Sequence, residues 1–98
     1  MKEVHFQEKY PLTVVEVLKT ETTFADAPQI VAYFEEKIKT TDKVVFIGTF
    51  DHYAHTTNIG GDIAPEIKSA FNVVFCFGYA LPNPMVLAVR PRSIGIAD

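Results

Sequence analysis

Two short stretches of the chain are apolar at almost every position, namely residues 43–50 (KVVFIGTF) and residues 72–79 (NVVFCFGY). Both are too short for a helix that takes part in tertiary packing, and both are rich in the β-branched and aromatic side chains that favour strands. A strand that is apolar on both of its alternating faces needs cover on both sides. The two stretches therefore predict the central pair of strands in a small sheet.

One segment has the pattern of an amphipathic helix. Its apolar residues recur at steps of three and four, at Ile30, Val31, Phe34 and Ile38. Charged residues cover the opposite side, as expected for a helix that packs one face onto a sheet. Asp26 precedes this segment and is placed to accept hydrogen bonds from the free amides of a first helical turn. We therefore expect one long helix that begins just after Asp26.

Shorter elements are predicted around this helix and strand pair. Residues 12–20 (LTVVEVLKT) are dominated by Val and Thr and predict a first strand, and residues 93–97 predict a last one. Asp62 is placed to cap a short helix between the two central strands, and Asn83-Pro84 to begin a helical turn further on. Together these elements predict the α+β class. We expect a two-layer sandwich with a small, mostly antiparallel sheet of three to five strands, covered on one face by one long helix plus short helices.

Composition limits the class of protein further. The chain has 98 residues and a mass of 11.0 kDa, so we expect residues 1–98 to form a single domain that folds alone. The 9 Lys and Arg against 12 Asp and Glu give a net charge of −3 and form no basic stripe, which argues against nucleic acid as a partner. Residues 1–9 are charged throughout, and the longest apolar run, residues 73–81, is far shorter than the 18 or so residues of a membrane span. With a single cysteine, the composition predicts a cytoplasmic protein that neither is exported nor enters a membrane.

The predicted sheet lacks a second cover. Only one long helix is expected, and it covers one face, whereas the strands are apolar on both faces. A large apolar face of this kind marks an interaction surface. We therefore predict that the chain forms a homodimer.

The residues after the first central strand are unusually polar and include two histidines. His52 and His55 are three residues apart, so on a helical turn both imidazoles face the same way and would share a metal, with Asp51 nearby. Zinc signatures have four ligands in two paired spacings, and the only further candidates, His5 and Cys76, are distant in sequence. The simpler interpretation is that both histidines cap the strand end and hydrogen-bond to nearby carbonyls. Binding of a metal, including a haem iron held by one histidine, is the alternative.

Cys76 lies in the second central strand between Phe75 and Phe77. A thiol among apolar neighbours in a strand is usually an inert core residue. A thiol-dependent enzyme that uses Cys76 and His52 is an alternative, and it requires the strand end and the polar loop to lie side by side. No motif of a known thiol enzyme flanks Cys76, so we favour a protein that is not an enzyme.

The order of these elements resembles the domain of unknown function 302 family of small bacterial and archaeal proteins. The resemblance covers residues 12–98, and its most specific points are Asp51-His52 at one strand end and Phe77-Gly78 at the end of a later strand. The resemblance implies a two-layer α+β domain, a homodimer, no assigned reaction, and a role for His52 in lining a site.

These observations together predict a homodimeric module that binds a small molecule or a protein. We expect its polar pocket to be formed by Asp51, His52, Tyr53, His55 and Gly78. The sequence identifies neither the ligand nor a cofactor. Metal or haem binding by His52 and His55, and thiol chemistry by Cys76 with His52, remain the alternatives.

Overall fold

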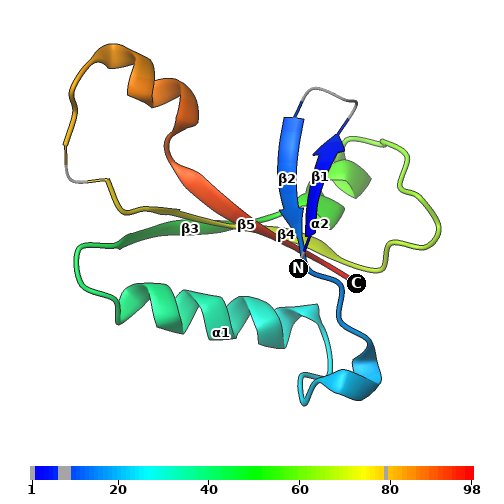
Figure 1. Cartoon of the computed structure of the whole chain (residues 1–98). Coiled ribbons are helices and arrows are strands. Elements are labelled where there is room, and N and C mark those ends of the chain that lie inside the picture. Colours follow the sequence, from blue (N-terminus) through cyan, green and yellow to red (C-terminus); the bar gives the residue numbers. More distant parts are fainter. Residues whose placement is uncertain (1, 7–9, 79) are drawn as a thin grey trace.

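The structure is a computed structural model that describes residues 2–6, 10–78 and 80–98. Its elements follow one another as β1 (Lys2–Phe6), β2 (Tyr10–Val14), the 3₁₀ helix η1 (Lys19–Glu21), α1 (Ala27–Lys39), β3 (Val45–Asp51), α2 (His52–Asn58), β4 (Ala70–Cys76), the 3₁₀ helix η2 (Pro84–Val89) and β5 (Arg92–Ala97). Strands β3, β4 and β5 form an antiparallel sheet in the order β3-β4-β5, and α1 lies across one face of it (Figure 1). The predicted α+β class is confirmed.

The core lies between α1 and this sheet. The buried side chains are Ala27, Val31, Ile38, Val73 and Ile96. Val73, in the central strand β4, has no exposed surface at all, and the half-buried Phe34 and Phe46 pack against the cluster. The predicted helix is confirmed, because the apolar stripe of α1 faces the sheet and the Asp26 carboxylate accepts a hydrogen bond from the Gln29 amide at 3.1 Å.

The opposite side of the sheet, which we call the second sheet face, is defined by the strand register. Val73 faces α1, and so does its cross-strand partner Thr49, whose hydroxyl donates to Glu35 of α1 at 2.6 Å. Because strand residues alternate between faces, the residues between these positions point the other way. The second sheet face thus consists of Val45, Gly48, Phe50, Ala70, Asn72, Val74, Cys76, Ser93, Gly95 and Ala97.

The described residues leave most of the second sheet face without a covering element. Helix α2 covers only one end of it, where His52 and His55 pack against Phe50. Val45, at the other end, is 63% exposed, and Phe50 is 44% exposed. The prediction that the two central strands are covered on both faces is therefore not met within a single described chain.

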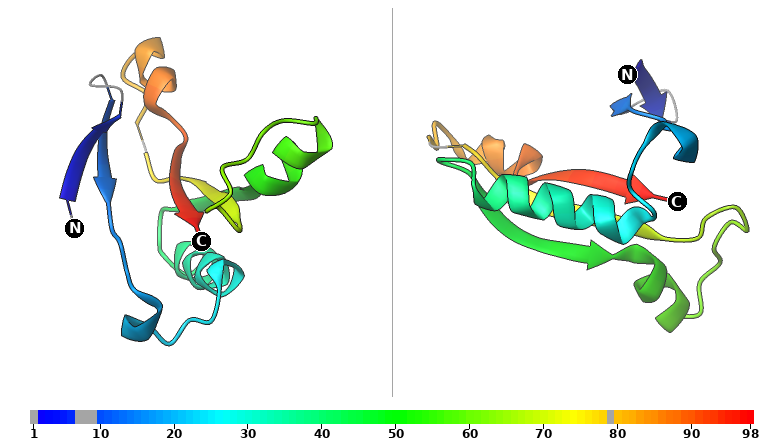
Figure 2. Two further views of the ribbon diagram at one scale, coloured as in Figure 1. Left: turned by 90° about the vertical axis from the view of Figure 1, so that its right-hand side faces the viewer. Right: turned by 90° about the horizontal axis from the view of Figure 1, so that it is seen from below.

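The hairpin of β1 and β2 stands apart from the rest of the molecule. It is an antiparallel pair that hydrogen-bonds to no other strand within the described part of the chain, and it projects beyond β5 on the side away from α1 (Figure 2). The radius of gyration is 15.2 Å, against about 13 Å for a compact domain of this length. The chain is therefore extended for its size.

Several predicted elements need correction. The strand predicted over residues 12–20 ends at Val14, and β1 was not predicted. The short helix was expected after Asp62, but the helix in this connection is α2, and residues after Asp62 form only a turn in which the Ile67 amide donates to the Ala64 carbonyl at 3.0 Å. The physical reason is that Asp51 caps α2 at the strand end, so the helix forms in the first half of the connection.

Other predicted elements are confirmed. The last strand, β5, has nearly the bounds expected, and η2 begins where Asn83-Pro84 predicted, with the Asn83 side chain accepting from the Met85 amide at 2.9 Å. Tyr79, at the end of the second predicted central strand, lies outside the described residues. Within the part of the chain that the structure describes, no helix is both long and apolar enough to cross a membrane.

Candidate functional site

The predicted site begins where β3 runs directly into α2. Asp51 is the last residue of β3, and its carboxylate accepts a hydrogen bond from the Ala54 amide at 2.9 Å, which fixes the start of the helix. The spacing of His52 and His55 places both rings on one side of this helix, against the same Phe50 ring. The centroid distances to Phe50 are 4.7 Å for His52 and 5.3 Å for His55. The two imidazoles therefore meet at an aromatic ring on the surface.

Helix α2 borders a small depression, which we call the α2 hollow. Its volume is about 200 Å³, and it lies between the helix and the loop that leads to β4. The residues that line it are His52, Tyr53, Thr56, Asp62, Ile63, Ala64, Ile67 and Ala70. Two of the five predicted site residues, His52 and Tyr53, therefore line a hollow, but its volume is below the 300 Å³ or so of most small-molecule sites.

Gly78 lies at the other end of the sheet. Asp51 is opposite Phe71 in the register of β3 and β4, whereas Cys76 is opposite Val45. Gly78 follows Cys76 by two residues, so the antiparallel arrangement separates it from Asp51 and His52. The predicted grouping of Gly78 with the α2 residues is thus not what the structure shows, because the sequence alone did not fix the direction in which β4 leaves the loop.

Gly78 has a different neighbour, Arg90. The Arg90 guanidinium packs onto the Gly78 backbone, where an added side chain would collide with it, and it donates a hydrogen bond to the Ala80 carbonyl at 2.7 Å. This contact ties the chain before η2 to the chain after it. The lack of a side chain at Gly78 therefore leaves room for the Arg90 guanidinium that holds this loop together.

The same register separates Cys76 from His52. The five residue steps from Phe71 to Cys76 correspond to about 16 Å along β4. Cys76 is half-buried on the second sheet face, and His52 lies on α2 beyond the far end of that face. The structure therefore does not form the Cys76 and His52 pair that a thiol-dependent enzyme would use.

Metal ligands are also few around the histidines. Asp51 uses its side chain to cap α2. Among the residues that the structure describes, no three side chains of His, Cys, Asp or Glu are grouped so that they could hold a metal ion. Metal binding at His52 and His55 would thus need at least one ligand that the described His, Cys, Asp and Glu side chains do not supply.

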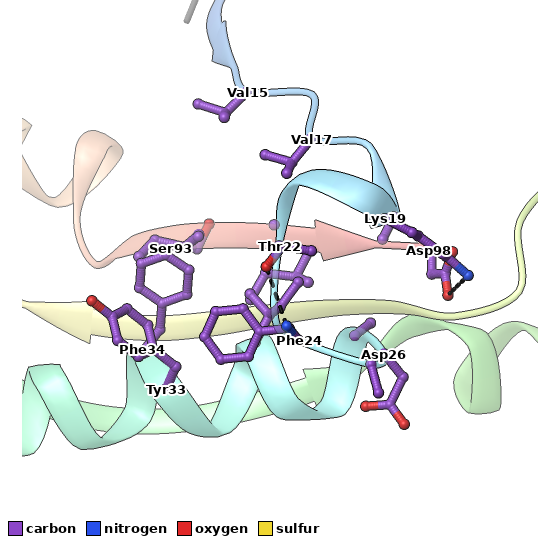
Figure 3. A pocket seen from close by; sticks show the side chains of 17 residues that line it. Val15, Val17, Lys19, Thr22, Phe24, Asp26, Tyr33, Phe34, Ser93 and Asp98 are labelled. Carbon is purple, nitrogen blue, oxygen red and sulfur yellow. Dashed lines mark hydrogen bonds and ion pairs between the residues drawn. The ribbon is translucent and has the colours of Figure 1, made fainter.

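A larger cavity, the β5 cavity, lies along the free edge of β5 (Figure 3). Its volume is about 600 Å³, and it is bounded on its closed sides by the segment that leads from β2 to α1, by α1 itself and by β5. The residues that line it are Val15, Val17, Lys19, Thr22, Phe24, Ala25, Asp26, Ala27, Ile30, Tyr33, Phe34, Ser93, Ile94, Gly95, Ile96, Ala97 and Asp98. Most of this lining is apolar.

Aromatic and charged groups occupy different parts of the β5 cavity. Phe24 and Phe34 flank Tyr33 in edge-to-face contacts, with ring centroids 5.5 and 5.4 Å from the tyrosine ring. Lys19 and Asp98 form an ion pair at 3.2 Å on the other side (Figure 3). The cavity therefore combines an apolar wall with the Lys19–Asp98 ion pair at one end, and Asp26 lines it at the start of α1.

Sequence reasoning missed the β5 cavity. The available signal was the segment of residues 15–18 (VEVL), which carries more apolar side chains than an ordinary linker. Val15 and Val17 line the cavity and remain exposed, because the segment stays outside the sheet after β2 ends. The pattern was interpreted as part of a strand, so it gave no prediction of a cavity.

A three-stranded antiparallel sheet with one long helix across a single face places this chain among the small α+β domains. The family model described as "Family of unknown function (DUF6858)" matches residues 1–98, and the chain belongs to this family. The resemblance to the domain of unknown function 302 family is not confirmed by this match. No curated protein and no solved structure matches the chain.

Proposed function

We propose that this protein is a homodimeric module that binds a small, largely apolar molecule in the β5 cavity. The observation that carries the proposal is the cavity itself. Its volume of about 600 Å³ lies within the range of roughly 300 to 1,000 Å³ that is typical of small-molecule sites.

The lining favours a ligand with an apolar body. The side chains of Val15, Val17 and Ile94 offer aliphatic surface, and the cluster around Tyr33 offers aromatic edges. Lys19 and Asp98 supply an ion pair at one end, and Thr22, Asp26 and Ser93 add further polar groups to the lining. Sites of this kind hold a ligand by burying its apolar surface and orient it through a few polar groups.

The α2 hollow is a second candidate site for the same function. It has the polar side chains His52 and Tyr53 that the sequence singled out, but only about a third of the volume of the β5 cavity. A ligand that fits there is smaller or more exposed to water.

The homodimer part of the proposal is supported by surface area. The accessible surface of the chain is 7961 Å², whereas a folded monomer of 11.0 kDa exposes about 5,600 Å². The excess of roughly 2,300 Å² for each chain is of the size that stable dimers bury.

The binding site is tested with 1-anilinonaphthalene-8-sulfonate, an apolar fluorescent probe with one negative charge. Ala25 is exposed and lines the β5 cavity, so Ala25→Trp fills part of it; Ala32→Trp, on the exposed side of α1, is the matched control. We expect Ala25→Trp to raise the Kd of the probe by about tenfold or more and Ala32→Trp to leave it unchanged.

The same titration separates the two candidate sites. Equal probe affinity in wild type and Ala25→Trp would rule out the β5 cavity as the binding site. A loss of affinity in His52→Ala alone would assign the probe to the α2 hollow.

Metal binding by His52 and His55 is a second candidate function. It is favoured by one observation, that the imidazoles of His52 and His55 both contact the Phe50 ring. Elemental analysis and a visible spectrum of the purified protein test it. Stoichiometric metal or haem that is lost in His52→Ala would support it, and a metal-free wild type would contradict it.

A further inference from the structure

The second sheet face has a composition that is unusual for a surface in contact with water. None of its ten residues is charged, and its central polar side chains, Asn72 and Ser93, hydrogen-bond to each other at 3.0 Å. Antiparallel sheets that face solvent carry polar and charged side chains on the outer face. The pattern is that of a buried face.

We propose that a second copy of this chain covers the second sheet face, sheet against sheet, with Val45, Val74 and Cys76 in the contact. The inference rests on the homodimer part of the proposed function and names the surface that forms it. Sheets packed in this way interdigitate side chains from their two inner faces.

The absence of charge favours a second copy over a different protein. A two-fold interface brings the same patch together with itself, so any charge on the patch would approach a like charge. The residues of the second sheet face avoid this repulsion, and they offer no charge pattern that would select another partner.

The chain exposes roughly 2,300 Å² more surface than a folded monomer of its mass. The second sheet face supplies part of this excess, and its side chains Val45 and Phe50 are 63% and 44% exposed. The β1–β2 hairpin projects on the side of the second sheet face, away from α1 (Figure 1). An isolated two-stranded hairpin is only marginally stable, so a chain seated on this face would also give the hairpin a neighbour.

Two valines provide a matched test. Val45 on the second sheet face and Val89 in η2 are both 63% exposed, so Val45→Asp and Val89→Asp introduce the same carboxylate at equally exposed positions. In the dimer, Val45→Asp buries two unpaired carboxylates, so we expect the dimer dissociation constant to rise by about a hundredfold or more. Val89→Asp is expected to leave it unchanged. Sedimentation velocity gives both values, and circular dichroism shows whether each variant is folded.

Cys76 provides a second measurement that needs no variant. It is the single cysteine of the chain and half-buried on the second sheet face. We expect its reaction with dithionitrobenzoate to slow by about tenfold or more as protein concentration rises and the dimer forms. If Val45→Asp does not fold, this protection decides the question.

The outcomes separate the inference from the proposed function. A wild type that is monomeric at all concentrations overturns the homodimer and the inference together. A dimer that persists in folded Val45→Asp, or one in which Cys76 reacts as fast as in the monomer, overturns only the inference, because the chains then associate through another surface.

Discussion

Asp26, Asp51 and Asp62 each precede a segment that begins with helix-favouring features, yet the structure uses only the first two as caps. Asp26 accepts from the Gln29 amide and Asp51 from the Ala54 amide, whereas Asp62 starts no helix. Loss of a capping carboxylate costs about 0.5–2 kcal/mol where the helix is packed in the core. Removal of each aspartate therefore tests whether a helix begins at that position: α1 after Asp26, α2 after Asp51, and no helix after Asp62.

We expect Asp26→Ala to lower the free energy of unfolding by about 1 kcal/mol, because α1 packs onto the sheet. Asp51→Ala is expected to cost less, because α2 has no buried residue. Asp62→Ala is expected to change stability by less than about 0.5 kcal/mol. Urea unfolding of the three variants measures all three values, and a cost at Asp62 as large as that at Asp26 would contradict the observed position of α2.

Val73 is the one fully buried large side chain among the described residues. We expect Val73→Ala to lower the free energy of unfolding by about 2 kcal/mol, since it removes two methyl groups from a packed core. The exposed Val89 is the control, and Val89→Ala should stay within about 0.5 kcal/mol of wild type. Equal effects in chemical unfolding would show that the core does not lie between α1 and β4.

At the scale of elements, the contact between Gly78 and Arg90 links the two sides of the η2 loop. Gly78→Ala is expected to displace the Arg90 guanidinium and to weaken its hydrogen bond to the Ala80 carbonyl. Because the displaced group is the end of a flexible side chain, the expected loss of stability is small, about 0.5–1 kcal/mol.

Arg90→Ala should make Gly78→Ala nearly neutral when the two changes are combined. Thermal unfolding of the single and double variants tests this coupling. Simple addition of the two single effects would show that Gly78 and Arg90 do not act through each other.

Helices and strands were predictable from the sequence where the spacing of apolar residues fitted only one kind of element. The stripe of α1 and the apolar runs of β3 and β4 have local signals that agree with their burial, so their positions followed from the sequence. The connection between β3 and β4 was not predictable in the same way, because Asp51 and Asp62 are equally good helix caps in sequence. The helix forms after Asp51, where β3 ends, and this position of the strand end was not known from the sequence.

The candidate site was predictable only in part, for a topological reason. The proximity of His52 and His55 follows from their spacing in sequence, whereas the position of Gly78 depends on the antiparallel register of β3 with β4. The β5 cavity depends on contacts between residues 15–26 and β5, which are distant in sequence. A local pattern contains no signal for either.

At the scale of the whole molecule, the chain buries little for its size. Its core consists of five buried residues between α1 and the sheet, while the second sheet face and several large apolar side chains remain exposed among the described residues. A domain of this length has a stability of only several kcal/mol. Burial of the second sheet face in a dimer would add to that stability and make it depend on protein concentration.

Thermal unfolding at several concentrations checks this dependence. We expect the midpoint of wild type to rise by several degrees when the concentration increases about a hundredfold, because mass action favours the folded dimer. Val45→Asp should lose this dependence, and Val89→Asp should keep it. A midpoint that is the same at all concentrations would indicate that folding does not involve a second chain.

The most direct measurement is the mass of the unmodified protein in solution, determined by light scattering coupled to size-exclusion chromatography over about a hundredfold range of concentration. A homodimer predicts twice the 11.0 kDa of one chain at all but the lowest concentrations. A mass of 11.0 kDa throughout would contradict it, and the second sheet face would then be exposed to solvent in the native protein.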